Sequence, residues 1–158
     1  MSQLIAQLKE SYHHLDVASI PKLRSCYDDN VFFIDPVNEI AGLDALLSHF
    51  QSLYENLIYC RFHFDDEAQC IMESECFLQW TMEFQHARLN RAKTISVTGI
   101  SHLKFNKRVY YHKDWYDLGA MVYEHVPVVG GVIKLIKKKQ ASKKTRENNT
   151  KRQGSGNE

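Results

Sequence analysis

A change of hydrophobic period near residue 56 constrains the fold of this chain more than any other feature. Before that point, apolar residues recur every three or four positions, as Leu43, Leu47 and Phe50 do, which is typical of helices. After it, apolar and polar residues alternate, most clearly over residues 76–86, which indicates strands. Helices followed by a run of strands predict an α+β fold.

The helical period predicts helices at residues 3–14, 17–27 and 43–55. Pro21 falls in the first turn of the second helix, where proline is tolerated, and the run Asp28-Asp29-Asn30 is expected to end that helix. Strands are expected at residues 31–35, 57–64, 76–86, 93–105 and 108–117. This order predicts a cone-like, curved antiparallel sheet wrapped over three N-terminal helices and enclosing a pocket.

Charge is distributed unevenly along the chain. The net charge is +1, but the residues from Lys134 onward carry nine Lys or Arg and two Glu, a local net charge of +7. Residues 1–133 therefore carry a net charge of −6. An acidic body argues against a nucleic-acid-binding surface, so no specific nucleic-acid partner is expected.

The composition divides the chain into a domain at residues 1–118, an apolar-basic helical segment at 119–139 and a disordered basic tail at 140–158. The segment 119–139 ends in a cluster of lysines: Lys134, Lys137, Lys138 and Lys139. Two interpretations stay open, an amphipathic anchor on an anionic membrane surface or a helix that closes the mouth of the pocket.

The N-terminus lacks the pattern of a signal peptide, and no apolar run is long enough to span a membrane. A cytoplasmic location is expected, with peripheral membrane contact if the segment 119–139 is an anchor. The four cysteines have no metal-ligand or redox spacing and are expected to be reduced thiols. The eight histidines also lack ligand spacing, so no metal and no cofactor are expected.

The stretch Tyr27-Asp28-Asp29-Asn30-Val31-Phe32-Phe33-Ile34-Asp35-Pro36, followed by Gly42 and the third helix, resembles the nuclear transport factor 2-like superfamily. This superfamily includes ketosteroid isomerase and the SnoaL-like polyketide cyclases. The closing strands, SHLKF and YYHKDWYD, are also similar to family members, and the resemblance spans residues 5–117. It implies a cystatin-like α+β barrel, a fold that hosts enzymes, binding modules and assembly subunits alike.

The resemblance implies roles for several residues. Asp35 matches the general base of ketosteroid isomerase, and Tyr27 matches a pocket tyrosine of that enzyme. Tyr12 lies one residue away from the spacing of its oxyanion tyrosine. Ser101 stands where that enzyme has a carboxylic acid, and Phe50 replaces a supporting tyrosine, so steroid isomerase activity is not expected.

The resemblance also places His112 and Asp114 inside the same apolar cavity as Asp35. We expect Asp35 to act as the base, His112 as the acid or orienting group, and Asp114 as its charge partner. The predicted ligand-binding residues are Tyr12, Tyr27, Phe50, Tyr54, Trp80, Met82, Phe84, Ser101, Leu103 and Tyr116. The predicted function is binding of a small apolar carbonyl compound, with proton transfer of the isomerase or cyclase type.

Three alternatives remain open at this stage. Asp35 can simply cap the turn at Pro36, and His112 can pair with Asp114 without any ligand. The chain would then be a non-catalytic interaction module whose C-terminal segment binds a partner or a membrane.

His49, on the third helix, either borders the pocket or is a partly exposed side chain. On the outer face of the last strand, a stripe predicts either a homodimer interface, which we favour, or packing against a helix: Val109, Tyr111 and Trp115.

Overall fold

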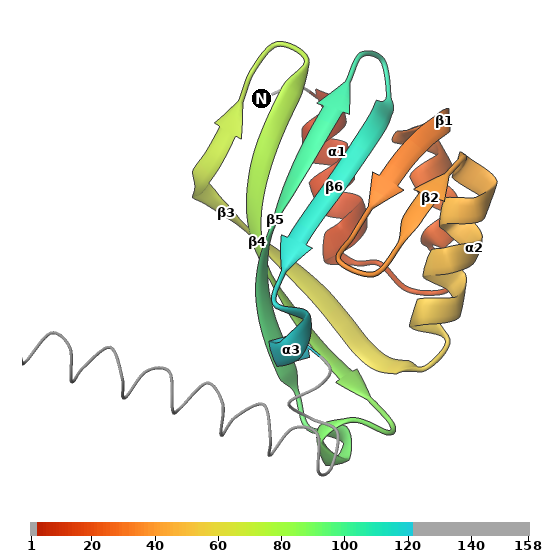
Figure 1. The fold of residues 1–158 in the computed structure, drawn as a ribbon, viewed down its shortest axis with the longest axis vertical. Helices are drawn as coiled ribbons and strands as arrows, with labels where there is room; N and C mark the ends of the chain where they lie inside the picture. The colour runs from red at the N-terminus through yellow and green to blue at the C-terminus, as the bar shows by residue number, and fades with distance from the viewer. Residues whose placement is uncertain (1–2, 122–158) are drawn as a thin grey trace, which may run out of the picture. The chain divides into compact units, whose positions relative to one another are not determined.

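A computed structural model describes residues 3–121 and has the predicted α+β architecture (Figure 1). The helical elements are α1 (Gln3–His13), η1 (Ile20–Ser25), α2 (Leu43–Tyr54), η2 (Asn90–Ala92) and α3 (Leu118–Met121). The strands are β1 (Tyr27–Ile34), β2 (Glu39–Ala41), β3 (Leu57–Ile71), β4 (Glu75–His86), β5 (Ile95–Phe105) and β6 (Val109–Tyr116). They form one sheet in the order β2-β1-β6-β5-β4-β3.

The predictions for the C-terminal segment and tail lie outside the described residues from position 122 onward. Within the described part, no helix is long and apolar enough to cross a membrane. All four cysteines are free thiols, and Cys26 and Cys76 are buried.

The second predicted helix is shorter than expected and is the 3-10 helix η1. It follows a reciprocal cap, in which the backbone N–H of Ser19 donates to Asp16 Oδ1 and the backbone N–H of Asp16 donates to Ser19 Oγ. Hydrogen bonds from the side chain and then the backbone N–H of Ser19 lower the pKa of the Asp16 carboxyl group. The run Asp28-Asp29-Asn30 lies within β1 instead of ending a helix, because β1 pairs with β6 from Tyr27 onward. Pairing across the sheet thus overrides the local turn tendency of these residues.

The sheet register brings side chains of β1, β5 and β6 together on the inner face. β1 and β6 pair in parallel, unlike the other strand pairs, with Phe33 beside His112. β5 and β6 are antiparallel, with Ser101 opposite Asp114. Residues directly opposite one another share a face of the sheet, so Ser101 and Asp114 are placed for contact.

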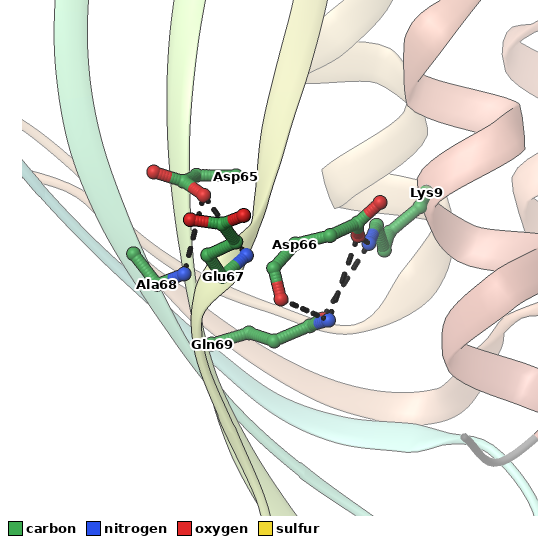
Figure 2. Close-up of polar contacts among 6 residues, drawn as sticks. All are labelled: Lys9, Asp65, Asp66, Glu67, Ala68 and Gln69. Carbon is green, nitrogen blue, oxygen red and sulfur yellow. Dashed lines mark hydrogen bonds and ion pairs between the residues drawn. The ribbon is translucent and has the colours of Figure 1, made fainter.

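β3 extends seven residues beyond its predicted end because a register shift interrupts its alternation between Phe64 and Gln69. At this irregularity, Asp65 Oδ1 accepts the backbone N–H groups of Glu67 and Ala68 (Figure 2). The Nζ of Lys9 on α1 donates to Asp66 and contacts Oε1 of Gln69 at 3.5 Å. The bulge therefore carries one of the contacts that tie α1 to the edge strand, beside the hydrogen bond between His13 Nδ1 and Phe62 O.

The helices α1 and α2 cover the inner face of the sheet and form the main core with it. α1 contributes Ile5, Leu8 and Tyr12, and α2 contributes its buried leucines and Phe50. Gly42 begins α2 with a positive φ of 92°, a conformation that favours glycine, and its N–H donates to Val31 O at 2.8 Å. The glycine predicted to precede this helix therefore has a backbone role.

The outer-face stripe needs a correction at Val109, which is fully buried. The β5–β6 register shifts between Lys104 and Phe105, so Val109 pairs with Phe105 in the core instead of following Tyr111 and Trp115 outward. The exposed outer face carries Trp115 and Ile100, which are 44% and 42% exposed.

Candidate functional site

A histidine lies in the aromatic core of the domain. His112 is only 3% exposed. Its ring stacks on Tyr27 at a centroid distance of 5.9 Å and meets the edges of Phe33 at 5.0 Å and Tyr12 at 6.3 Å. Burying an imidazole among aromatic rings is costly unless both nitrogens are hydrogen-bonded. The hydrogen-bond partners of His112 therefore determine which nitrogen carries a proton.

Both nitrogens of His112 have close partners. Nε2 lies 2.8 Å from Oδ1 of Asp114, and Nδ1 lies 2.6 Å from the Tyr27 hydroxyl. An ionised carboxylate only accepts hydrogen bonds, so Nε2 carries a proton, and in the neutral imidazole the hydroxyl of Tyr27 then donates to Nδ1. The Tyr27 oxygen in turn accepts from the Tyr12 hydroxyl at 2.7 Å. The result is a directed chain from Tyr12 through Tyr27 and His112 to Asp114.

A second chain of donors ends at the same carboxylate oxygen. Trp80 Nε1–H donates to Ser101 Oγ at 2.8 Å, and the Ser101 hydroxyl donates to Oδ1 of Asp114. Neither chain uses Oδ2 of Asp114, which accepts no hydrogen bond from any described residue. The Asp114 side chain is 16% exposed, so this oxygen is the proton acceptor that the network leaves available.

The indole of Trp80 reaches Ser101 because its neighbour in the sheet is a glycine. Gly99 pairs with Trp80 across β4 and β5. A Cβ atom at Gly99 would lie 2.3 Å from two ring atoms of Trp80, a distance that no side chain tolerates. The ring therefore lies across β5 only because position 99 has no side chain.

The tyrosines of the site are hydrogen-bond donors at neutral pH. Burial, followed by the charges of Asp35 and Asp114, raises the pKa of Tyr116. Burial also raises the pKa of Tyr12 and of Tyr27. A phenol with a raised pKa keeps its proton. Tyr116 therefore presents an O–H donor within electrostatic range of both aspartates.

A small cavity of about 20 Å³ adjoins the network. It holds roughly one water molecule, since one probe sphere needs about 10–15 Å³. Six predicted residues line it, namely Tyr12, Trp80, Ser101, Leu103, His112 and Asp114. Leu8, Phe62, Phe64 and Leu78 also line it and were missing from the prediction. The alternation of Phe62 and Phe64 in the predicted strand at residues 57–64 was the available signal for two of them.

Asp35 occupies a separate position at the end of β1. Its Oδ1 accepts the backbone N–H groups of Val37 and Asn38, both at 2.7 Å, and Nδ2 of Asn38 contacts both oxygens at 3.1 Å. It thus caps the turn after Pro36, as one of the two alternatives expected. Its side chain is only 8% exposed, but it makes no hydrogen bond to His112 or Asp114 among the described contacts.

The other predicted ligand residues do not line the small cavity. Phe50 is buried and meets Tyr12 edge-on at 6.2 Å, and the hydroxyl of Tyr54 accepts from the Cys60 thiol at 3.6 Å. Met82 and Phe84 are buried on β4. Across residues 3–121, no group of three or more His, Cys, Asp or Glu side chains is arranged to hold a metal ion.

Comparison with known protein families gives one domain match. The family model described as a SnoaL-like domain matches residues 8–112, which is most of the part that the structure describes. No functionally curated protein sequence matches this chain significantly.

Solved structures share the fold at low sequence identity. A nuclear transport factor 2-like protein of unknown function from Burkholderia pseudomallei is 15% identical, with a TM-score of 0.65, covering 77% of this chain and 95% of the other. A protein described as a SnoaL-like polyketide cyclase from Shewanella putrefaciens is also 15% identical, with a TM-score of 0.62 and coverages of 77% and 94%. A Catenulispora acidiphila protein with a ketosteroid isomerase-like fold, in complex with trimethylamine, is 7% identical, with a TM-score of 0.65 and coverages of 79% and 92%.

Proposed function

The chain belongs to the family of SnoaL-like domains, and we propose that it binds a small, mainly apolar carbonyl compound and moves a proton at the carbon next to the carbonyl group. The observation that carries this proposal is Oδ2 of Asp114, which accepts from no described residue and is held in place by two chains of donors that converge on Oδ1. A fixed carboxylate beside apolar walls suits general base catalysis.

The proposed step uses two groups on β6. Oδ2 of Asp114 takes a proton from the α-carbon of the ligand, and the electron pair of the broken C–H bond moves toward the carbonyl oxygen. The O–H of Tyr116 donates a hydrogen bond to that oxygen and stabilises its negative charge. His112 acts as a positioning residue, because its Nε2–H holds the other carboxylate oxygen. Return of the proton to the same or another carbon completes an exchange or an isomerisation.

One observation favours the alternative of a non-catalytic interaction module. The cavity beside the network holds only about 20 Å³, so a ligand larger than water requires side chains to move. In that alternative the hydrogen-bonded chains stabilise the core, and the segment 119–139 contacts a partner or an anionic membrane. Sedimentation with anionic liposomes tests that segment. Membrane contact predicts that the wild-type protein pellets with the liposomes and that a variant in which the four lysines of the segment are glutamines stays in the supernatant. Equal pelleting of the two proteins would contradict membrane contact through these lysines.

We also propose that the chain forms a homodimer through the outer face of the sheet. On this face His102 stacks on Phe77 at 4.3 Å and on Trp115 at 6.4 Å, beside the exposed Ile100. Contiguous exposed apolar surface of this kind is typical of interfaces. Light scattering should report a dimer for the wild type and a monomer for Ile100→Lys, whereas Val37→Lys, at a 63% exposed site elsewhere, should stay dimeric.

Deuterium exchange tests the proposed chemistry without knowledge of the natural ligand. Cyclohexanone in D₂O loses its α-proton NMR signals as they exchange, and we expect the wild-type protein to accelerate this loss. Asp114→Asn should lower the protein-dependent rate by about 100-fold, since a positioned base typically contributes that much or more. Tyr116→Phe should also lower it, and Asp29→Asn, an exposed carboxylate on β1, should leave it unchanged. Equal rates for the wild type and folded Asp114→Asn would refute the proposal.

A further inference from the structure

An open groove lies between α1 and the edge strand β3, outside the proposed proton-transfer site. Its volume is about 440 Å³, which is within the range of small-molecule sites in proteins. Residues three or four positions apart line it from one face of α1: Ala6, Lys9, Glu10 and His13. The strand β3 lines it with His63, Phe64 and Asp66. The proposed proton transfer at Asp114 makes no use of this groove.

Lys9 is the least exposed charged residue of the groove. Its side chain is 13% exposed, whereas the side chains of Asp66 and Glu10 are 71% and 75% exposed. Nζ of Lys9 lies 5.6 Å from the ring centroid of Phe64, in a cation–π contact. A largely covered ammonium group is costly unless an anion lies beside it. The groove therefore favours a negative charge at Nζ of Lys9.

Asp66 supplies a negative charge to Lys9, but the contact is easily exchanged. Nζ of Lys9 donates to Asp66, and it lies 3.5 Å from Oε1 of Gln69 (Figure 2). An ion pair whose carboxylate is mostly in water contributes little to stability. Asp66 also lies in the part of β3 between Phe64 and Gln69 where the pairing register with β4 shifts. Another carboxylate can therefore replace Asp66 at Nζ of Lys9 at little cost.

The remaining surface of the groove suits a flat aromatic ring. The rings of His13 and His63 meet edge-on, with their centroids 5.6 Å apart. Nδ1–H of His13 donates to the backbone carbonyl of Phe62 at 2.9 Å, because a carbonyl oxygen only accepts, and this bond fixes the imidazole ring. With Phe64, aromatic side chains line the groove from both α1 and β3. Aromatic ligands pack favourably against such rings, stacked or edge-on.

We propose that this groove binds small aromatic carboxylic acids. The ligand carboxylate takes the place of Asp66 at Nζ of Lys9, and the ligand ring packs against Phe64 and the two histidines. The carboxylates of Glu10 and Asp66 oppose the ligand only weakly, because exposed charges are screened by salt and water. The site is independent of the proposed function, since benzoate has no hydrogen on the carbon next to its carboxyl group and offers no proton to Asp114.

Benzoate and benzamide are matched probes for this site, because they share the ring and differ in charge. Their dissociation constants are measured by NMR titration at low ionic strength. The wild type should bind benzoate about tenfold more tightly than benzamide, or better, as expected for a charge-assisted hydrogen bond. The largest shifts should occur at the backbone amides of Lys9, His63 and Phe64, which border the groove.

Substitutions of the two ion-pair partners should change benzoate affinity in opposite directions. Lys9→Met keeps an apolar stem beside Phe64 but removes the charge, and should weaken binding about tenfold or more. Asp66→Asn removes the competing carboxylate and should tighten binding about two- to fivefold. Lys9→Arg keeps the charge and should still bind benzoate. Arg24→Met breaks the exposed pair with Asp44, away from the groove, and should bind benzoate like the wild type.

The opposite signs distinguish a binding site from an ion pair that only supports the fold, because loss of either partner would then have the same effect. Equal affinities of the wild type for benzoate and benzamide, or no binding of benzoate, would overturn the site. Unchanged binding in Lys9→Met or weaker binding in Asp66→Asn would also overturn it. The unfolding midpoints of both variants should stay close to that of the wild type, since the pair is weak. Deuterium exchange of cyclohexanone at Asp114 is unaffected by these outcomes, so the two proposals fail separately.

Discussion

At the scale of single residues, His112 shows how a polar side chain is kept in a core. Its imidazole is accommodated because Tyr27 and Asp114 satisfy its two nitrogens. The Tyr27 hydroxyl is the centre of the chain, since it also bonds to Tyr12. The Tyr27 hydroxyl therefore joins Tyr12 to His112 within the buried network.

Replacing that hydroxyl should have a measurable cost. Tyr27→Phe keeps the ring but leaves Nδ1 of His112 and the Tyr12 hydroxyl unpaired, so we expect a loss of about 1–3 kcal/mol in the free energy of unfolding. Urea denaturation measures it. Tyr110→Phe is the matched control, because Tyr110 is 40% exposed, and should change stability by less than about 0.5 kcal/mol. Equal effects of the two substitutions would show that the buried chain contributes nothing.

The residues of this network were only partly predictable. Alternation along residues 108–117 places His112 and Asp114 on one face, and the family resemblance turns that face inward. The bond between Tyr27 and His112 joins residues 85 positions apart, so no local pattern contains it. Asp35 was predicted to join the cluster, but the turn at Pro36 uses its carboxylate for capping instead.

At the scale of elements, β3 illustrates why strand ends are hard to read. The run Asp65-Asp66-Glu67 interrupts the alternation, yet the strand continues to Ile71 because a bulge absorbs these residues. The parallel pairing of β1 with β6 and the three-residue strand β2 were also unforeseen. Which distant strands pair depends on the whole sheet, so the hydrophobic pattern within one strand does not predict its partner.

The ion pair between Lys9 and Asp66 anchors α1 to this bulge (Figure 2). Asp66 is 71% exposed, so a double-mutant cycle with Lys9→Met and Asp66→Asn should give a coupling energy of only about 0.2–1 kcal/mol. That coupling should weaken in 1 M salt, where charges are screened within about 3 Å. The pair Arg24–Asp44, with both side chains more than half exposed, serves as the control and should couple more weakly still. A larger coupling for the control pair would contradict this ranking.

At the scale of the whole molecule, folding buries several weak acids in their neutral form. Burial raises the pKa of the Cys60 thiol to about 11 and that of the Cys76 thiol to about 12. It also raises the pKa values of Tyr27 and Tyr54. These groups hold protons more tightly in the folded than in the unfolded chain, so their contribution to stability is fully present below the unfolded pKa values and is lost as pH rises through the folded ones.

The free energy of unfolding should therefore decline steadily as pH rises above about 9, where thiols and phenols of the unfolded chain begin to ionise. Urea denaturation at a series of pH values from neutral to about 11 measures the decline. Tyr54→Phe removes one of the buried phenols and should make the decline shallower. A stability that stays constant across this range would mean that these side chains are not buried as described.

The central claim is that the buried pair His112 and Asp114 faces a bound carbonyl compound. The most direct measurement is the change in the ¹⁵N chemical shifts of the His112 ring during titration with cyclohexanone, assigned by loss of its signals in His112→Phe. We expect saturable shifts at His112 and none at His14, whose side chain is 67% exposed just after the end of α1. An unchanged His112 signal at concentrations that saturate binding elsewhere would show that the pair serves only to hold the core together.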